Sequence, residues 1–137
     1  MSEASPDRKL GPLRHLCEEE LAIVRKMISA TPLQQELDRQ ISDALVQDMP
    51  DGGIGSIKFY SGRPRAESEY GKLIAEAAFQ DGDGVPVSAT LSLDKSGYVF
   101  ELDMFKADGS PLMRYPNLDD FKIIKRHGKL GYAPQQS

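Results

Sequence analysis

The sequence predicts an α+β domain in which two N-terminal helices pack on one face of an antiparallel β-meander of about four strands. Three observations support this fold. Apolar residues recur at helical spacing in the first third of the chain, they alternate with polar residues from Ile57 to Met104, and turn motifs separate the alternating runs. The 137 residues suffice for one hydrophobic core and are too few for two.

Composition indicates an ordinary globular protein, with 39% hydrophobic and 28% charged residues. We expect an extended or disordered leader at 1–12, a single α+β domain at 13–127 and a flexible tail at 128–137. No apolar run approaches the roughly 20 residues of a membrane span, and the N-terminus lacks the apolar segment of a secretory signal. The single cysteine, Cys17, excludes an intramolecular disulfide. We therefore expect a cytoplasmic protein.

Charge is distributed unevenly along the chain. Residues 1–121 contain all 21 acidic residues and 13 of the 17 basic residues, a net charge of −8, whereas residues 122–137 carry +4. An acidic body argues against nucleic-acid binding, which needs a basic face. A protein partner with a basic surface fits this charge better. No membrane and no cofactor is expected as a partner.

The first helix is expected over residues 16–29. Three glutamates stand in its first turn and Arg25 and Lys26 near its end, an arrangement that suits the helix dipole. Its expected buried stripe consists of Leu21, Val24, Met27 and Ile28.

The second helix is expected over residues 31–47. Thr31 is a candidate cap, Pro32 fits the first helical position, and Gln34 completes a capping box. The apolar residues at helical spacing are Leu33, Leu37, Ile41, Ala44 and Leu45. The glycine-rich run at 52–56 then indicates a helix cap and a turn, because a phosphate-binding loop leads from a strand into a helix instead.

Four strands are expected after the helices. The first covers 56–60, and the others follow the alternating runs at 73–79, 87–93 and 98–104. The run at 73–79 could equally be helical, because it is rich in alanine. The polar stretch 61–71 is expected to be an exposed loop.

A four-residue turn at 94–97 sets the expected register of the last two strands. It pairs Leu91 with Phe100, and every inward pair is then apolar. The expected outward pairs are Thr90 with Glu101, Ser88 with Asp103, and Glu76 with Thr90.

The chain becomes irregular after Lys106. Two interpretations remain open near its end, since Asn117 could cap a short turn or 121–124 could form a final strand. The apolar residues of this region predict that 112–124 cross the domain and cover a sheet edge or the helix pair.

Two motifs invite a metal or catalytic interpretation and do not support one. The run Asp81-Gly82-Asp83-Gly84 lacks the glycine and the glutamate that an EF-hand loop needs at its sixth and twelfth positions, so a hairpin turn is favoured. His15 and Cys17 have too few companions for a zinc site or for a nucleophile and base.

The candidate site is the outward face of the sheet. Glu76, Glu101 and Asp103 are expected on this face, which makes it an acidic docking surface for a protein. A pair of carboxylates can act as general acid and base only in a cleft that raises one pKa, and an open sheet face provides no such burial. The alternative is a small enzyme or ligand-binding protein with a pocket near Arg114 and Asp103. There Arg114 would bind an anion and Glu101, Asp103 or Asp108 would serve as acid or base.

Three motifs carry a resemblance to a known family. They are D-G-G-x-G-S at 51–56, D-G-V-P-V-S at 83–88 and F-E-L-D-x-x-K-x-D-x-S-P-L at 100–112. Over about residues 8–116 the chain resembles a family of small uncharacterised bacterial proteins, a domain of unknown function. The resemblance implies no established activity. Small acidic α+β proteins of this sort resemble immunity proteins that neutralise bacterial toxins, an analogy at the level of fold class. We expect a non-catalytic protein-interaction module with an acidic face rather than an enzyme.

Overall fold

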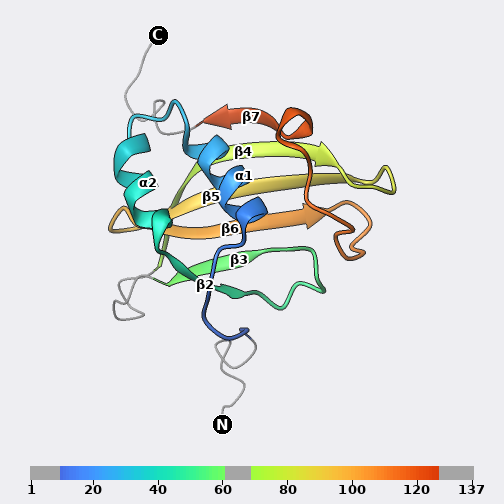
Figure 1. Cartoon of the computed structure of the whole chain (residues 1–137), viewed down its shortest axis with the longest axis horizontal. Helices are drawn as coiled ribbons and strands as arrows, with labels where there is room; N and C mark the ends of the chain where they lie inside the picture. The colour runs from blue at the N-terminus through green and yellow to red at the C-terminus, as the bar shows by residue number, and fades with distance from the viewer. Residues whose placement is uncertain (1–9, 61–68, 127–137) are drawn as a thin grey trace.

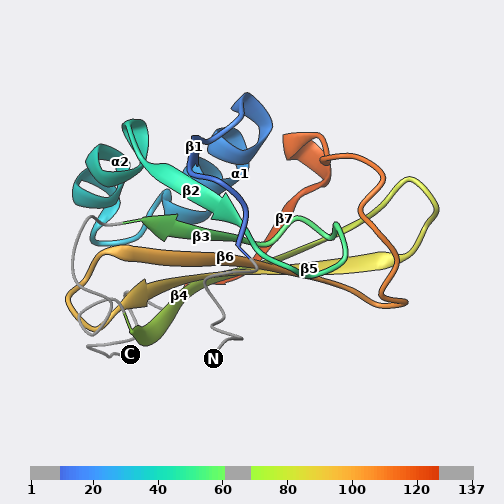
Figure 2. The same cartoon turned by 90° about the horizontal axis from the view of Figure 1, so that it is seen from below.

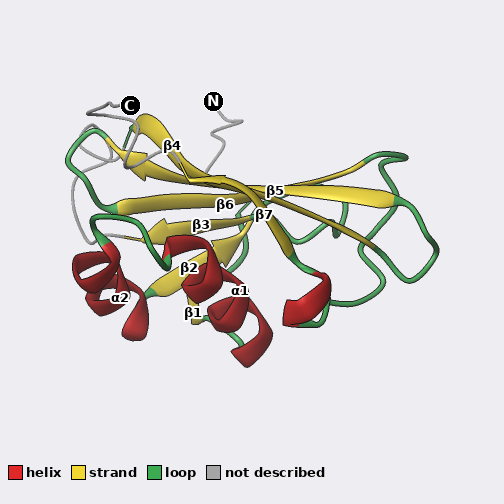
Figure 3. Cartoon of the chain, turned by 90° about the horizontal axis from the view of Figure 1, so that it is seen from above, coloured by secondary structure: helices red, strands yellow, loops and turns green. Residues whose placement is uncertain are grey.

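A computed structural model describes residues 10–60 and 69–126 of the chain. Two helices, α1 (Glu18–Ile28) and α2 (Gln34–Ser42), lie on one face of an antiparallel sheet (Figure 1, Figure 3). The expected leader and tail and most of the expected polar loop fall on residues 1–9, 127–137 and 61–68, outside the described residues.

Over the described residues the sheet has seven strands, and the prediction of a meander of about four strands is wrong. The strands are β1 (Arg14–His15), β2 (Leu45–Asp48), β3 (Ile57–Tyr60), β4 (Tyr70–Gln80), β5 (Pro86–Asp94), β6 (Val99–Lys106) and β7 (Lys122–Arg126). Their spatial order is β1-β2-β3-β6-β5-β4-β7. Only β4, β5 and β6 form a meander. β3 pairs with β6 instead of β4, so two strands separate β3 from its successor in the sequence. The broad α+β class holds.

The additional strands come from segments that were expected to be helical, irregular or undecided. β2 consists of residues that we had assigned to the end of the second helix. That assignment followed from Leu45, which continues the helical spacing from Ile41. In the structure Val46 is the fully buried residue of this segment, and it lies opposite Phe59 of β3. A four-residue strand is too short for an alternating pattern to stand out.

The predicted capping box of α2 does not form, and α2 begins at Gln34. The Thr31 hydroxyl donates a hydrogen bond of 2.7 Å to the carbonyl of Ile28, and the Gln34 side chain accepts one of 3.1 Å from the Ala30 N–H. These groups therefore stabilise the turn that follows α1. No helix in the described part of the chain is long and apolar enough to cross a membrane.

The β5–β6 register differs from the expected one by two residues. Leu91 lies opposite Leu102 instead of Phe100, and Thr90 lies opposite Asp103. A shift of two residues preserves which side chains face inward, because side chains alternate with a period of two. The expected inward residues of β5 and Leu102 and Met104 of β6 are confirmed. At the turn end the expected set is wrong, because Val99 is in the core, Tyr98 is 40% exposed and the Phe100 ring lies under Lys58. All of the expected pairs are wrong.

A β-bulge causes this register shift. Leu93 pairs with Val99 while Ser92 pairs with Glu101, which leaves Phe100 as an extra residue on β6. The predicted pairing of Glu76 with Thr90 across β4 and β5 is confirmed.

The core lies between the helices and the inward face of the sheet. Its fully buried side chains include Ile23, Met27, Leu37, Ile41, Ile57, Leu91, Leu102 and Phe121. The prediction that 112–124 cover a sheet edge or the helix pair is confirmed for the end of this segment, because β7 pairs with β4 along that edge and η3 (Leu118–Asp120) contacts α1. Both open interpretations of this region hold in part. A short 3₁₀ helix forms with Asn117 at its N-cap position but without a side-chain cap, and the final strand follows as β7.

The glycine-rich run at 52–56 connects β2 to β3, so it is a hairpin loop and not a helix cap. The Asp51 carboxylate accepts hydrogen bonds of 3.2, 3.1 and 2.8 Å from the N–H groups of Gly53, Ile54 and Ser56. Gly52, Gly53 and Gly55 have positive φ angles, which suits glycine at these turn positions.

Candidate functional site

The sheet face opposite the helices, here called the open face, carries the candidate residues. Figure 2 shows both helices on the other side of the sheet, and no described helix covers the open face. Its side chains come from five neighbouring strands: Lys58, Glu76, Ala78, Ser88, Thr90, Ser92, Glu101, Asp103, Phe105 and Lys125. Lys125 of β7 lies opposite Glu76 at one end of this face.

Three of the five predicted site residues lie on this face. Glu76 pairs with Thr90, and Thr90 pairs with Asp103, so the three residues form one row across β4, β5 and β6. We call it the acidic row. Glu101 lies one row further along, between Ser92 and Lys58. The strand spacing of about 4.8 Å places Glu76 and Asp103 on the order of 10 Å apart at their backbones.

Glu101 lies in a partly desolvated part of the face. Its Oε2 is 4.0 Å from the Lys58 Nζ, which also lies 3.8 Å from the centre of the Phe100 ring. Burial raises the pKa of the Glu101 carboxyl, and the charge of Lys58 offsets this only in part. Burial likewise lowers the pKa of Lys58. The bulge places the Phe100 ring beneath Lys58. Lys58 is therefore held by a cation–π contact with Phe100 as well as by its long ion pair with Glu101.

Asp103 is an exposed member of the acidic row. Its Oδ1 accepts a hydrogen bond of 3.1 Å from the Ser56 hydroxyl, whose oxygen in turn accepts one of 2.8 Å from the Met104 N–H. The Ser56 hydroxyl thus provides a hydrogen-bond acceptor for the Met104 N–H, where the β3–β6 ladder ends. It also orients the Asp103 carboxylate.

Exposed aromatic side chains accompany the acids. Phe105 is 67% exposed and lies opposite Ser88 on the open face. Tyr60 is exposed at the end of β3, and Tyr70 is exposed with its ring edge-on to Phe100, at 6.4 Å between centroids. Aromatic residues are enriched where proteins bind one another.

The other two predicted residues lie elsewhere. The Asp108 carboxylate accepts hydrogen bonds of 3.0 and 2.7 Å from the N–H and the hydroxyl of Ser110, which closes the turn after β6. Arg114 lies against the β4–β5 turn, where a Cβ on Gly82 would be 3.6 Å from the guanidinium carbon. Neither residue therefore joins the open face.

A buried ion cluster that the sequence interpretation missed lies beside them. Lys106 is fully buried, and its Nζ lies 2.8 Å from both Asp81 Oδ2 and Asp83 Oδ2 and 3.0 Å from the Pro111 carbonyl oxygen. We call these groups the Lys106 cluster. Burial alone would lower the pKa of Lys106, but the two carboxylates outweigh it and raise the pKa.

The Lys106 cluster fastens the chain after β6 to the β4–β5 turn. Asp81 also accepts hydrogen bonds from the N–H groups of Met113, at 2.7 Å, and Arg114, at 3.3 Å. The hairpin-turn interpretation of 81–84 is confirmed, and its carboxylates bind a lysine within the protein. Within the described residues, no group of three or more His, Cys, Asp or Glu side chains could hold a metal ion.

A second, partly buried cluster joins α1 to the strands beside it. Glu20 accepts two hydrogen bonds from the Arg14 guanidinium, at 2.9 and 2.8 Å, and one from the Tyr115 hydroxyl at 3.2 Å. Arg14 also binds Asp48 of β2 at 2.8 Å. Burial raises the pKa of the neighbouring Cys17 thiol, which makes Cys17 a poor nucleophile. We therefore interpret this cluster as a set of contacts that stabilise the fold.

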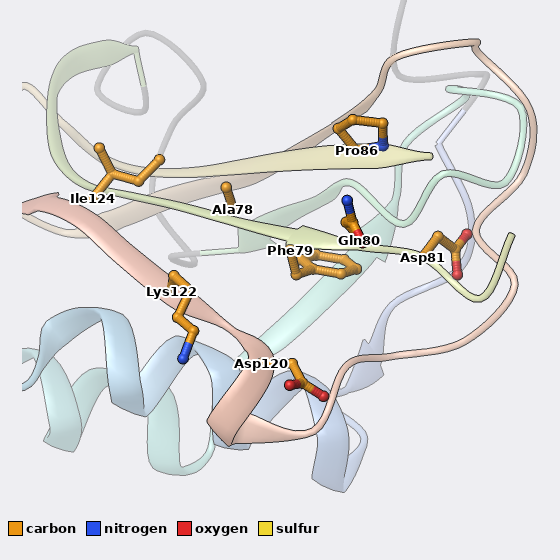
Figure 4. A pocket seen from close by; sticks show the side chains of 8 residues that line it. All are labelled: Ala78, Phe79, Gln80, Asp81, Pro86, Asp120, Lys122 and Ile124. Atoms are coloured by element: carbon orange, nitrogen blue, oxygen red, sulfur yellow. The ribbon is translucent and has the colours of Figure 1, made fainter. Parts of the chain in front are cut away.

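The structure has a cavity of about 620 Å³ at the edge formed by β4 and β7 (Figure 4). Neither Arg114 nor Asp103 lines this cavity. The two residues also lie apart, one on the β4–β5 turn and one on the open face. The arrangement gives no support to the predicted alternative of a pocket shared by Arg114 and Asp103.

Comparisons with known proteins identify a matching family but assign no activity to it. A family model described as "Domain of unknown function (DUF6984)" matches residues 13–116. This segment includes both helices, β1 to β6 and both clusters. No curated protein and no solved structure matches the chain.

Proposed function

The chain belongs to the DUF6984 family, a domain of unknown function, and we propose that it is a non-catalytic protein-interaction module whose open face binds a partner with a basic surface. One observation carries the proposal. An acidic row and Glu101 share a sheet face with exposed aromatic residues, and no described helix covers that face.

The chemistry of this face favours binding over catalysis. The carboxylates of the acidic row project from an open sheet that provides no cleft for a substrate. Burial raises the pKa of Glu101, which lies one row further along. Exposed Phe105 and Tyr70 provide apolar area beside the acids. A partner that supplies Lys or Arg next to apolar side chains would complement both features.

Two arrangements of a second copy on this face bring like charges together. A two-fold axis along β5 through Thr90 would place Glu76 of one copy over Asp103 of the other, and an axis along the acidic row would place each acid over its own counterpart. We propose a different, basic protein as the partner, in keeping with the net charge of −8 over residues 1–121.

Further parts of the proposal concern the setting. We propose a bacterial protein of the cytoplasm, supported by the family resemblance and by the single cysteine. A basic toxin neutralised in the manner of an immunity protein would be one such partner. The net charge of −8 over residues 1–121 supports this idea, and the fold class adds an analogy only.

The test compares neutralised variants as baits. The immobilised chain is incubated with lysate of its source organism beside the variant Glu76→Gln, Glu101→Gln, Asp103→Asn. A matched control removes the same charge from the exposed residues Glu18, Glu19 and Asp43 of the helix side, as Gln, Gln and Asn. We expect a basic protein that the chain and the control retain and that the open-face variant loses. That protein, purified, should bind the chain directly. An identical set of retained proteins for all three baits contradicts the proposal.

A further inference from the structure

β7 is the last strand in the order of the sheet, and its outer edge is open over the described residues. It pairs with β4 on one side, and no described strand pairs with it on the other. Figure 3 looks onto this edge, and no described segment crosses it. An edge strand directs half of its backbone N–H and C=O groups away from the sheet, so a further extended chain can pair with them.

This edge is basic although the body of the protein is acidic. β7 has the sequence K-I-I-K-R, with three cations and no acid, whereas residues 1–121 carry a net charge of −8. The acids closest to it in the sequence, Asp119 and Asp120, belong to η3, which ends before the strand begins. The charge of this edge therefore attracts anionic groups rather than cationic ones.

Two of the three cations are available to another molecule. Lys122 and Lys125 are exposed, and the Lys122 ammonium, which has three hydrogens to donate, uses one on the Asp119 carbonyl. Lys125 lies opposite Glu76 but forms no ion pair with a described residue, and Glu76 has an interaction of its own. The Arg126 guanidinium is committed, because it donates hydrogen bonds of 3.2 and 3.0 Å to the end of α1.

Ile124 adds an apolar contact between the two lysines. It is the extra residue of a bulge, since its neighbours Ile123 and Lys125 pair with consecutive residues of β4. Ile124 is 64% exposed, and Figure 4 shows it projecting away from the helices, whereas Lys122 projects to the helix side. A chain lying along β7 would therefore meet both cations and an exposed isoleucine.

We propose that the outer edge of β7 binds an extended acidic segment of another protein, which adds to the sheet as a further strand. The inference is independent of the proposed function, because it concerns the opposite charge and another part of the sheet. The β7 backbone hydrogen-bonds to the segment, and Lys122 and Lys125 pair with its Asp or Glu side chains. An apolar side chain of the segment packs against Ile124.

Charge and backbone chemistry decide against other occupants. Lysines and bulges hinder an edge strand from pairing with its own kind, and a second copy paired along the whole strand would set Lys122 against Arg126. The chain's own residues 127–137 contain Lys129 and no acid, and their two glycines and one proline are unfavourable in strands. A nucleic acid would meet the lysines, but only a polypeptide backbone continues the ladder of the sheet.

The test uses a blocked peptide of about seven residues, in which Glu alternates with Val, as the probe. Backbone amide spectra of the isotope-labelled full chain report the affinity and the place of binding. We expect the largest shifts and slowed amide exchange in β7, and neither at β1, the opposite edge of the sheet. Two control peptides should bind on the order of tenfold more weakly. One has Lys in place of Glu, and the other has the unchanged sequence with methylated backbone nitrogens.

A charge swap locates the contact. Lys122→Glu combined with Lys125→Glu should weaken the Glu peptide on the order of tenfold and strengthen the Lys peptide by a similar factor. A gain in binding of the Lys peptide cannot result from loss of the strand. Arg39→Glu combined with Lys95→Glu is the matched control, since both side chains are exposed and lie outside β7. It changes the net charge equally and should leave both affinities nearly unchanged.

Four results would overturn the inference. Equal effects of the charge swap and its control would show that the peptide does not bind at β7. Equal affinity of the methylated peptide, or of a single-stranded oligonucleotide of the same charge, would indicate a general attraction of anions. An affinity that rises about tenfold on deletion of residues 129–137 would show that the chain's own end occupies the edge. Shifts in β7 that depend on protein concentration without peptide would indicate a second copy.

Discussion

Lys106 occupies the last inward position of β6 and is the largest fully buried side chain of the described residues. Lys106→Met would remove the cation and leave Asp81 buried without its counter-charge. Such uncompensated burial is strongly destabilising. We expect the melting temperature, followed by circular dichroism, to fall by on the order of ten degrees. Lys95→Met is the control, because Lys95 is 68% exposed and pairs with Glu69 at the surface. Equal melting of the two variants would show that the Lys106 cluster contributes little.

Asp81 makes the stability of the protein depend on pH. Burial raises the pKa of its carboxyl, but the hydrogen bonds from Lys106, Met113 and Gly82 outweigh burial and hold the pKa at about 2. The unfolded value is about 3.9. This group therefore stabilises the fold fully above about pH 4, and the contribution is lost as the pH falls towards about 2. We expect the melting temperature of the protein to fall more steeply over this range than that of Asp81→Asn. Parallel curves would contradict the assignment.

The sequence contained a signal for Lys106 that periodicity analysis passed over. The inward alternation Leu102, Met104 continues to position 106, and a turn with two aspartates follows the neighbouring strand. In a sequence pattern, a charged residue at an inward position is normally taken to mark the end of the strand. It is recognised as a buried residue only when its counter-charges are identified too. Asp81 and Asp83 are more than 20 residues away in the sequence, so only the strand pairing reveals the contact.

At the scale of elements, the sequence predicted the helices and strands whose apolar residues repeat often enough for a period to be recognised. α1 and the strands β3, β5 and β6 follow from their periodicity, whereas the alanine-rich run of β4 had left a helix open as the alternative. β1 and β2 have two and four residues, which is too short for a repeat. The predicted register of β6 was wrong for another reason. The bulge at Phe100 shifts it, and Phe100 contacts Lys58 and Tyr70 from distant parts of the chain, which the sequence pattern does not reveal.

Residues next to β7 give a matched pair of substitutions. Phe121 immediately precedes the strand, is fully buried and lies 5.9 Å from the Phe79 ring, whereas Ile124 of the strand is mostly exposed. Phe121→Ala should lower the free energy of unfolding by about 3–5 kcal/mol. Ile124→Ala should change it by about 0.5 kcal/mol or less. Urea denaturation measures both, and similar losses would mean that β7 is held by the edge ladder rather than by Phe121.

Truncation extends this prediction to the whole C-terminal segment. Ending the chain after Ser110 removes Phe121 and the partly buried Leu112 and Tyr115, at about 1.5–3 kcal/mol for each large side chain. We expect this variant to lose its cooperative thermal transition. Ending the chain after Gln135 should leave the melting temperature unchanged. A stable shorter variant would show that the segment is dispensable for the fold.

At the scale of the whole molecule, the charge distribution predicts the kinetics of binding. The acidic body should attract a partner with a basic surface before contact, and salt screens such attraction. We expect the association rate constant, measured by stopped flow, to fall on the order of tenfold between low and high salt. The open-face variant should depend less on salt. A rate that is independent of salt would exclude electrostatic attraction by this face.

Composition and patterning predicted the class of the molecule but only part of the candidate site. Glu76 and Asp103 were assigned to one face by alternation alone, and their row required the observed register. The cavity could not be predicted, because it depends on where β7 leaves β4. No residue pattern in the chain marks that point.

The separation of β3 from β4 in the sheet has a consequence for synthesis on the ribosome. β3 pairs only with β2 until β6 emerges, and about 40 residues lie between Tyr60 and Val99. At about 5–20 residues per second, the apolar side chains of Ile57 and Phe59 wait for several seconds without their final neighbours. The local β4–β5–β6 meander can form as soon as it is made. The nascent chain is therefore most exposed to aggregation through β3, and that risk ends when β6 joins the two halves of the sheet.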